Sequence, residues 1–358
     1  MQTKLNVELN KIENHILKAF NSVSTQVINK EWLQTQVNYY YNPPKLEINI
    51  PNDLINFIDY YIDKRKDEIK PASVTKYNVI KHKMERMQVS RGSQILIKDI
   101  GENFKDEFVN YYKKESYSVN TTQRELAIIK TFCKYAKTKG LETHLELDSL
   151  KLKKEKVEKI YLNFDELKKI ETIDNNELSD YLINAKDWLI ISCFTGQRIS
   201  DFMRFNSDMI RIDNGKPLIE FTQVKTDRLM TIPLHKKVLE ILKKRNGEFP
   251  RAISNQRYND YIKIVCKKAG LNELITGKIQ TNLTPENKNT KIRSVQGTFQ
   301  KWELVTSHIG RRSFATNFYS QIPTTLLINV TGHSTETMFL NYIGKSNKDL
   351  AMELINYF

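Results

Sequence analysis

The chain reads Thr306-Ser307-His308-Ile309-Gly310-Arg311-Arg312-Ser313-Phe314-Ala315 near its C-terminal end. Its apolar and polar residues are spaced as in a helix, and His308 and Arg311 are three residues apart. Residues three apart on a helix lie on one face, so a titratable imidazole and a cation are expected to share one site. The stretch therefore predicts a helix that carries a polar site.

Two further groups follow this helix. Thr331-Gly332-His333-Ser334 contains a second histidine, and Tyr342 comes nine residues after His333. On one unbroken helix, that spacing is a rotation of about 900° and a rise of about 13 Å, which places the two side chains on opposite faces. If both serve one site, the helix that opens at Ser334 breaks before Tyr342, or the tyrosine lies on a separate segment that ends at Gly344.

An arginine and a lysine come earlier in the chain. A strongly apolar helix, expected over about 181–194, is followed by Thr195-Gly196-Gln197-Arg198-Ile199-Ser200-Asp201. The pattern then changes to a period of two, which predicts two strands on either side of a turn at Thr226-Asp227. Lys225 is therefore expected to be the last residue of a strand, at a hairpin tip.

Each of these residues alone is more often structural than catalytic, but the set suits one task. Two arginines, a lysine, two histidines and a tyrosine can stabilise a pentacoordinate phosphorane while a phenolate attacks phosphorus. Two guanidiniums grip the non-bridging oxygens and keep their charge. A tyrosine has a pKa near ~10, so cations or an imidazole must favour its deprotonation. A lysine at a hairpin tip can protonate the leaving 5′-oxygen.

The candidate catalytic residues belong to one basic region of the chain, and one carboxylate accompanies them. They are Arg198, Lys225, His308, Arg311, His333 and the nucleophile Tyr342, with Asp201 as the carboxylate able to pair with Arg198. The region contains no Asp or Glu cluster suited to Mg²⁺ and no glycine-rich phosphate loop. We therefore expect no metal, no ATP and no other cofactor. Three cysteines lie in apolar runs and are expected to be buried thiols: Cys133, Cys193 and Cys266.

The charge of the whole chain points to an anionic partner. Its 358 residues include 56 Lys and Arg against 42 Asp and Glu, a net charge of +14. Nucleic acid is the first candidate for such a partner. No apolar run approaches the ~20 residues that span a membrane, and the N-terminus lacks a signal pattern. We expect a cytoplasmic protein without membrane contact, associated with the nucleoid when bound to DNA.

The length suits two or three domains. Residues 1–48 show two ragged helical patterns, too little for a core of their own, and are expected to be a helical appendage left from a larger module. Residues 49–141 contain four helical patterns and predict a small helical domain, in which Ser73 and Asn120 begin two of the helices. Residues 142–160 lose the apolar period and are expected to be a basic linker.

Residues 161–358 form the expected second domain, mainly helical with a small β-hairpin. Residues 270–305 are polar and loop-rich, and another hairpin is the best interpretation of them. Basic side chains on the helical domain, the linker and the second domain are candidates for phosphate contacts, although a solvated surface explains each of them as well. They are Lys76, Lys81, Arg86, Arg124, Lys130, Lys151, Lys153, Lys154 and Arg312.

These motifs resemble the tyrosine recombinases of the phage integrase family, whose catalytic residues are Arg, Lys, His-x-x-Arg, His or Trp, and Tyr in that order. The segment around Arg198 is similar to the first arginine box of the family, with Asp201 where many members have Glu. Lys225-Thr226, followed by Ile232-Pro233-Leu234, resembles the lysine hairpin.

The C-terminal motifs complete the resemblance. The segment from His308 to Ala315 is similar to the second arginine box, with Gly310 where Leu is common. His333 and Tyr342 have the nine-residue spacing that is usual in the family. Integrases of mobile elements often begin with an arm-site-binding domain that includes a small sheet, and residues 1–45 show no clear sheet.

The resemblance implies a mainly α, α+β protein: a helical core-site-binding domain followed by a catalytic domain with the DNA breaking-rejoining enzyme fold. It implies strand cleavage through a covalent 3′-phosphotyrosyl intermediate and rejoining through a Holliday junction, for integration or excision of a mobile element. The partners would be double-stranded DNA core sites and accessory DNA-bending or directionality factors, with a free monomer forming a tetramer on DNA. An apolar tail would dock on a neighbouring protomer or on its own domain: Leu350, Met352, Leu354, Ile355, Tyr357 and Phe358.

Several other functions fit the same residues. A chromosome-dimer resolvase or an invertase of this family has the same catalytic set. A type IB topoisomerase or a hairpin telomere resolvase shares the chemistry. A DNA-binding regulator with an inactive site belongs to a different class, and the presence of all six residues argues against it.

Overall fold

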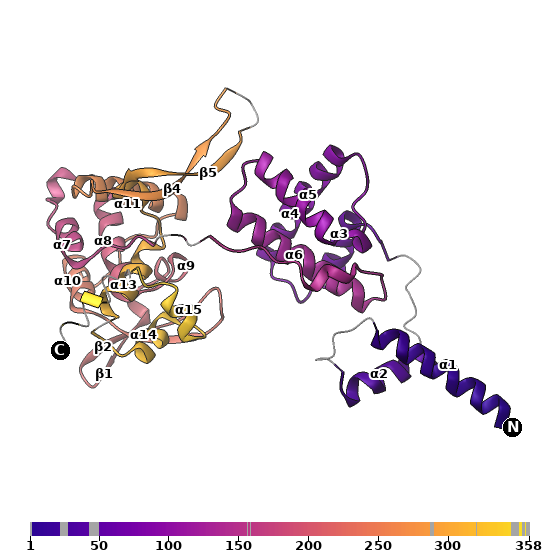
Figure 1. Cartoon of the computed structure of the whole chain (residues 1–358). Coiled ribbons are helices and arrows are strands. Elements are labelled where there is room, and N and C mark those ends of the chain that lie inside the picture. Colours follow the sequence, from indigo (N-terminus) through magenta and orange to yellow (C-terminus); the bar gives the residue numbers. More distant parts are fainter. Residues whose placement is uncertain are drawn as a thin grey trace. The chain divides into compact units, whose positions relative to one another are not determined.

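The computed structural model of the protein describes residues 2–21, 28–42, 50–155, 157, 159–286, 290–319, 321–344, 351–352 and 355. The chain forms two compact units, Met1–Glu155 and Lys156–Phe358 (Figure 1). Each unit has its own buried apolar cluster. The described residues are mostly helical with two small sheets, which confirms the expected α+β class. None of their helices has the length and apolar character needed to cross a membrane.

The first unit starts with two helices, α1 (Gln2–Phe20) and α2 (Lys30–Tyr41), which pack on each other. Tyr40 Oη donates a hydrogen bond to Glu8 Oε1 at 2.9 Å and joins them. No residue of α2 is buried. Both helices lie where the sequence predicts helices, and neither adds a residue to the buried cluster of this unit.

Four helices build that cluster: α3 (Leu54–Lys64), α4 (Pro71–Arg91), α5 (Glu102–Lys114) and α6 (Val119–Thr138). Aromatic rings fill its centre, where Tyr61 meets Phe132 at 5.0 Å between ring centroids. A buried ion pair from Lys83 Nζ to Glu125 Oε1, at 2.8 Å, joins α4 to α6. Tyr112 Oη donates to the other oxygen of this carboxylate, so the buried charges are fully paired.

Two helix starts differ from the sequence prediction. Helix α4 begins at Pro71, because the N–H that proline lacks would have no partner at the first helical position, and Ser73 lies inside the first turn. Helix α6 begins directly after Ser118, whose hydroxyl accepts a backbone N–H of the first turn. Asn120, the expected cap, instead exchanges two hydrogen bonds of 3.0 Å with the main chain of Glu155.

The segment expected to be a linker, residues 142–160, is partly packed. Leu147, in the 3₁₀ turn Leu145–Asp148, and Leu150 are buried in the cluster of the first unit. Lys130 Nζ donates to the main-chain oxygen of Leu150 at 2.7 Å and holds this turn in place. The linker prediction was wrong for this turn because two apolar residues are too few to show a period.

The second unit is built around α8 (Asp180–Thr195), which is buried on nearly all sides. Trp188 and Leu189 are fully buried, and burial all round explains why the helix is apolar without a period. It packs on α11 (Asn255–Lys268) and α13 (Ile309–Phe318). Further helices among the described residues of this unit are α7 (Phe164–Glu171), α9 (Ile199–Phe202), α10 (Lys236–Lys244), α12 (Lys301–Leu304), α14 (Thr324–Thr331) and α15 (Glu336–Leu340).

Helices α8 and α13 approach very closely at Gly310. A Cβ atom on Gly310 would lie 2.0 Å from Ser192 Oγ and 2.6 Å from Ser192 Cβ. No side chain fits at these distances without moving one helix. Leucine is common at this position in the family that the sequence resembles. Here Ser192 on the facing helix occupies the space that such a side chain would need.

A three-stranded antiparallel sheet contains β1 (Ile210–Asp213), β2 (Lys216–Thr222) and β3 (Leu229–Pro233). The sequence predicts β2 and β3 but misses β1, although Asn214 and Gly215 have the positive φ values of a tight hairpin turn. Strand β2 ends at Thr222, so Lys225 lies in the connecting loop and not at the end of a strand.

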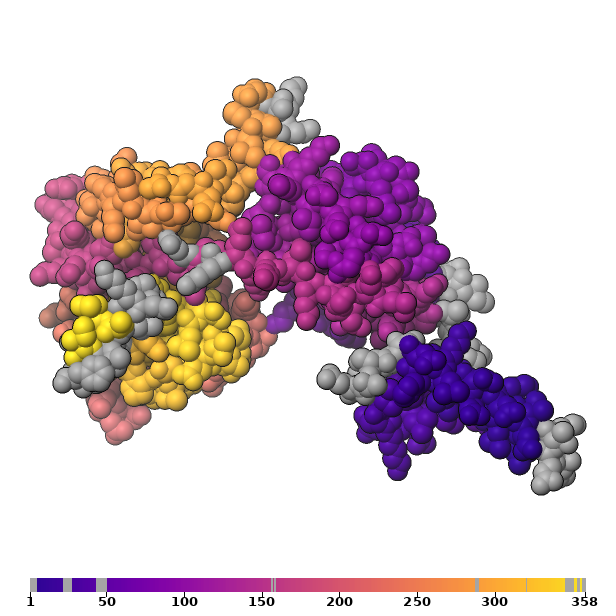
Figure 2. Space-filling view, viewed as in Figure 1, coloured from indigo at the N-terminus to yellow at the C-terminus, as the bar shows by residue number. Residues whose placement is uncertain are grey.

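The region 270–305 does contain a hairpin, as the sequence suggested. Strands β4 (Leu274–Asn282) and β5 (Ile292–Gln300) pair in antiparallel register with Gly277 opposite Gly297. A Cβ atom on Gly277 would lie 2.6 Å from Leu304 Cδ2, so α12 packs directly on the base of this hairpin. The hairpin stands out from the helices of the second unit (Figures 1 and 2).

Candidate active site

Arg198 is placed by the end of α8. The helix stops at Gly196, which has φ 68° in the left-handed region, and a Cβ atom there would lie 2.6 Å from the Phe314 ring. Glycine therefore satisfies both the turn and the close contact. Two residues later Arg198 occupies the N-cap position of α9, and its Nη1 donates to Gln223 Oε1 at 3.3 Å.

Arg311 is fully buried and connects three segments. Its Nη1 donates to Gly196 O at 3.0 Å, and its Nη2 donates to Thr331 O and lies 3.2 Å from His333 Nε2. Burial and the charge of Arg198 lower the pKa of Arg311, and the nearby Tyr342 acts in the opposite direction. A guanidinium so enclosed remains charged but has a fixed direction.

His333 is held neutral beside this arginine. His333 is 5% exposed and follows Gly332, the left-handed residue that ends α14. Because a guanidinium only donates, Nε2 accepts from Arg311, and Nδ1 carries the proton that it donates to Thr331 Oγ1 at 2.8 Å. Burial and the charges of Arg311 and Arg198 lower the pKa of His333 to about 3.

Tyr342 lies against these two residues. Its ring centroid is 4.7 Å from that of His333 and 5.5 Å from Arg311 Cζ. Helix α15 lies between His333 and Tyr342 and is only five residues long. The expectation that the two residues do not share one unbroken helix is confirmed.

The segment after Tyr342 is anchored to the catalytic unit. Gly344 N donates to Thr316 Oγ1 at 3.0 Å. A Cβ atom on Gly344 would lie 2.7 Å from the Tyr161 ring and 2.9 Å from Lys159 O. Gly344 is thus enclosed between α13 and the residues that enter the second unit.

His308 and Lys225 lie on the exposed side of this group. His308 is the N-cap residue of α13, three residues before Arg311. Its pKa is lowered by desolvation and then by the charges of Arg312, Arg311, Arg198 and Lys225. Lys225 is exposed in the β2–β3 loop, near enough for its charge to act on the imidazole. The structure therefore brings all six candidate residues to one region.

Asp201 supports the lysine loop and not Arg198. Its side chain is fully buried, and Oδ1 accepts a hydrogen bond from Val224 N at 2.9 Å. Its negative charge also opposes the lowering of the Arg311 pKa. The pair with Arg198 that the sequence suggested is thus replaced by a contact with the residue before Lys225.

Sequence reasoning missed two residues of the site, Gln197 and Gln223, which are both fully buried. It also gave no role to the Thr331 hydroxyl. Both glutamines lie close to a motif residue, Gln197 beside Arg198 and Gln223 two residues before Lys225. That nearness was the available signal, but an uncharged amide has no pattern that separates it from a surface glutamine.

The basic residues considered for phosphate contacts differ in their surroundings. Lys81 Nζ is paired with Asp59 at 2.6 Å, and Lys130 Nζ binds main-chain oxygens. Arg312 is half-buried, and desolvation lowers its pKa. The remaining candidates are exposed: Lys76, Arg86, Arg124, Lys151, Lys153 and Lys154.

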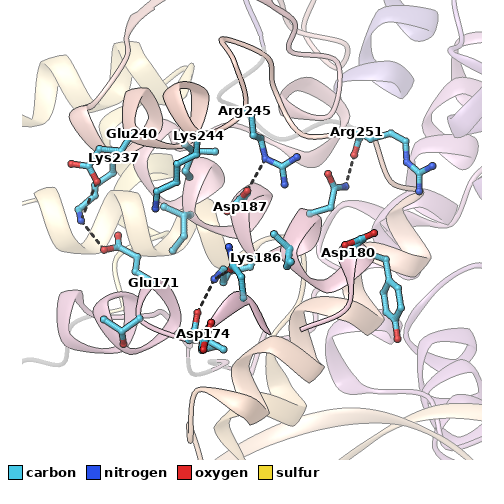
Figure 3. Close-up of a pocket in the computed structure, with 18 residues that line it drawn as sticks. Glu171, Asp174, Asp180, Lys186, Asp187, Lys237, Glu240, Lys244, Arg245 and Arg251 are labelled. Atoms are coloured by element: carbon cyan, nitrogen blue, oxygen red, sulfur yellow. Dashed lines mark hydrogen bonds and ion pairs between the residues drawn. The ribbon is translucent and has the colours of Figure 1, made fainter. Parts of the chain in front are cut away.

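A cavity of about 920 Å³ lies elsewhere in the second unit (Figure 3). Ion pairs of 2.7 Å cross its lining, from Lys237 to Glu171 and from Arg245 to Asp187. It opens along the first half of α8, and Thr195 at the end of that helix is eight positions, or about 12 Å, beyond Asp187. None of the six candidate residues lines the cavity. The cavity is therefore distinct from the group around Arg311.

Comparison with known proteins gives two family matches. The phage integrase family matches residues 151–348, and the phage integrase SAM-like domain matches residues 53–154. The family match covers more than half of the chain and includes all six candidate residues. No curated protein matches the sequence.

Solved structures with a similar fold include integrases bound to DNA. The Tn1549 transposon integrase (residues 82–397) with a circular intermediate DNA has a TM-score of 0.60 at 13% identity, covering 86% of this chain and 100% of that chain. Lambda integrase (residues 75–356), as a dimer bound to a COC′ core site, has a TM-score of 0.58 at 18% identity, covering 82% and 96%. A lambda integrase tetramer bound to a Holliday junction has a TM-score of 0.57 at 18% identity, covering 91% and 87%.

Proposed function

The chain belongs to the phage integrase family of tyrosine recombinases, and from that premise we propose that it is a site-specific DNA recombinase in which Tyr342 is the nucleophile. The observation that carries this proposal is the place of the Tyr342 ring, next to a fully buried arginine and a neutral histidine. Arg198 is near enough to Arg311 for its charge to lower the pKa of Arg311, and we place the phosphate at these two guanidiniums, beside the phenol. The function is cleavage and rejoining of DNA strands.

The cleavage step assigns a role to each group. Tyr342 Oη bonds to phosphorus, the bond from phosphorus to the 5′-oxygen breaks, and the 3′ end of the DNA stays on the tyrosine. Arg198 and Arg311 bind the non-bridging oxygens, where negative charge develops. Lys225 donates a proton to the leaving 5′-oxygen. The 5′-hydroxyl of a partner strand then reverses the step, and two such exchanges pass through a Holliday junction.

The two histidines have different roles in this step. His308 is neutral near pH 7 because desolvation and four cations lower its pKa, so it can accept the proton of the phenol. The accepting nitrogen of His333 is already bonded to Arg311. His333 therefore orients the arginine and does not exchange a proton with the substrate.

The proposed partners are supported by the likeness to integrases that were solved with DNA. Lambda integrase has been captured as a dimer on a core site and as a tetramer on a Holliday junction. For this chain we infer a monomer when free and four protomers on two double-stranded core sites, aided by accessory DNA-bending or directionality factors. The compartment is the cytoplasm, with the nucleoid as the DNA-bound location. The tail residues Leu350, Leu354, Tyr357 and Phe358 lie outside the described residues.

A mobile element is the preferred setting over chromosome-dimer resolution or inversion. The supporting observation is the likeness to a transposon integrase, which extends over 86% of this chain. An enzyme is favoured over a DNA-binding regulator for a different reason. All six catalytic positions are filled and brought together.

The first prediction tests the nucleophile. Purified protein is incubated with sheared genomic DNA in EDTA, stopped with SDS, and the covalently linked fragments are captured on a filter and sequenced. A nicked suicide duplex is then built from the captured sequence. The unsubstituted chain should give a covalent adduct, and Tyr342→Phe should give none while its affinity for the same duplex stays within about twofold, because only the attacking oxygen is lost.

Three results would contradict parts of the proposal. An adduct that survives Tyr342→Phe would exclude Tyr342 as the nucleophile. A footprint on DNA without any adduct from the unsubstituted chain would favour a regulator. Loss of the adduct in EDTA, with recovery on addition of Mg²⁺, would contradict the expected independence of metal.

A further inference from the structure

An uncharged glutamine lies at the centre of the site. The side chain of Gln223 is fully buried, and its Oε1 accepts from Arg198 Nη1 at 3.3 Å and from Thr226 Oγ1 at 2.7 Å. Because a guanidinium only donates, the atom that faces Arg198 has to be the amide oxygen, and this fixes the orientation of the amide. One oxygen atom therefore joins Arg198 to the loop that carries Lys225.

The amide nitrogen of Gln223 makes the opposite connection. It donates to Gln197 Oε1 at 3.4 Å, and Gln197 Nε2 donates in turn to Val330 O at 2.8 Å. A Cβ atom on Gly332 would lie 2.8 Å from Gln223 Nε2, so the residue before the buried histidine packs on this amide. The two glutamines thus link the end of α8 to the end of α14.

The main chain of Gln223 closes the lysine loop. Its N–H donates to Arg228 O, and its carbonyl accepts from Asp227 N, both at 2.9 Å. Asp227 has φ 55°, which completes a tight turn immediately after Lys225 and Thr226. Side chain and main chain of one residue therefore fix the arginine and the base of the loop at the same time.

We propose that Gln223 is a positioning residue that keeps the Arg198 guanidinium and the Lys225 loop in a common arrangement for cleavage. The inference rests on the proposed function and adds a residue outside the catalytic set. Arg198 acts on the non-bridging oxygens and Lys225 on the leaving oxygen of the same phosphate. A displacement of about 1 Å between two such groups can slow a reaction by about 100-fold.

The test uses Gln223→Met, which keeps the length of the side chain and removes its three hydrogen bonds, to Arg198, Thr226 and Gln197. Single-turnover cleavage is measured with excess protein on two suicide duplexes. One carries the ordinary phosphodiester, and the other carries a 5′-bridging phosphorothiolate, in which sulfur replaces the leaving oxygen. A thiolate leaves without a proton donor, so the second duplex no longer requires Lys225.

Gln223→Met is expected to slow cleavage in two ways, through a misplaced Arg198 and through a misplaced Lys225. With the ordinary duplex, Gln223→Met should be slowed about 10- to 100-fold, with DNA affinity within about twofold of the unsubstituted chain. With the sulfur duplex the defect should shrink by about tenfold, because the part due to a misplaced Lys225 disappears. Lys225→Ala should recover almost completely on sulfur, and Arg198→Ala should not recover.

A second variant covers the case in which Gln223→Met does not fold. Thr226 is exposed, so Thr226→Val removes only its hydrogen bond to the amide. It should show a smaller defect that also recovers on sulfur, and the double variant should be no slower than Gln223→Met alone. Gln34→Met, at an exposed glutamine of α2 in the first unit, is the matched control and should cleave both duplexes normally.

Each outcome bears on a different statement. Full activity of Gln223→Met and Thr226→Val in an active protein would overturn the inference and leave the proposed function intact. Equal defects on oxygen and sulfur would also overturn it, because Gln223 would then act through Arg198 alone. Absence of an adduct from the unsubstituted chain would overturn the proposed function, and the inference with it.

Discussion

Two histidines with the same reference pKa have different surroundings in one site. His333 is buried, and its two ring nitrogens bond to Arg311 and to Thr331. His308 is exposed, and its pKa is lowered by desolvation and then by the charges of four nearby cations. Both pKa values are lowered, but only His308 has an open face toward a substrate. This difference supports the proposal that His308 accepts the proton of the phenol and that His333 orients Arg311.

The buried histidine predicts how stability changes with pH. The pKa of His333 falls from 6.5 to about 3 on folding, so between these values the unfolded chain binds a proton that the folded chain does not. Stability should therefore rise with pH up to about 6.5 and then level off. Between about pH 5 and pH 7 the gain from this group is about 1 to 2 kcal/mol after allowance for solvent screening.

Chemical denaturation of the unsubstituted chain and of His333→Gln at the two pH values checks this contribution. The glutamine variant should lose the part of the pH dependence that His333 supplies, while His308 and His235, whose pKa values are also lowered, keep theirs. His82→Gln, at an exposed histidine of the first unit, is the control and should keep it. An unchanged pH dependence in His333→Gln would show that the folded pKa is not lowered.

The sequence predicts the charged residues of the site better than the neutral ones. Arg198, Lys225 and Arg311 follow from motif chemistry, because a phosphate needs cations. Gln197 and Gln223 do not follow, since their importance comes from burial between segments that are distant in the chain. Asp201 was found by its position, but its partner is a main-chain N–H that no side-chain pattern indicates.

At the scale of elements, helices with a clear apolar face were predictable and their ends were not. The start of α6 depends on whether Ser118 or Asn120 accepts the first backbone N–H, a choice settled by the tertiary contact between Asn120 and Glu155. Strand β1 is four residues long and mostly exposed, so it has no apolar alternation to detect. Short elements depend on their neighbours more than on their own sequence.

The contact between α8 and α13 gives a prediction at this scale. Gly310→Ala should destabilise the second unit by about 1 to 3 kcal/mol, because the added methyl group overlaps Ser192. Thermal unfolding measures the loss. In a Ser192→Gly background the same substitution should cost less, since the overlapping Oγ and Cβ atoms are gone.

The two substitutions together form a double-mutant cycle. The coupling between them should offset the loss, so the double variant should be more stable than the sum of the single effects predicts. Additive effects would indicate that the helices move apart freely at this point. Because Arg311 follows Gly310, Gly310→Ala should also lower cleavage activity. This activity should recover in the double variant together with stability.

For the whole molecule, the net charge of +14 does not describe which cations can meet DNA. Lys130 holds a turn of its own unit, whereas Lys154 is exposed at the end of the packed segment. Lys154→Ala should therefore reduce the slope of log affinity against log salt concentration, for binding to a random-sequence duplex, by about one.

Lys130→Ala is the matched comparison. It should leave the salt dependence unchanged and lower the thermal midpoint of the first unit, because two main-chain oxygens lose their donor. Binding titrations at several salt concentrations, with unfolding curves of both variants, check the pair. A drop in salt dependence for Lys130→Ala equal to that for Lys154→Ala would contradict the assignment.

The enclosed Gly344 limits how far the tyrosine can travel. It is two positions after Tyr342, and an extended chain of that length spans about 7 Å. While Gly344 stays bonded to Thr316 and packed on Tyr161, the phenol moves on a short tether whose fixed point belongs to the same chain as Arg311. We therefore expect the tyrosine to attack a phosphate held by its own protomer, because reaching another protomer would first require release of Gly344.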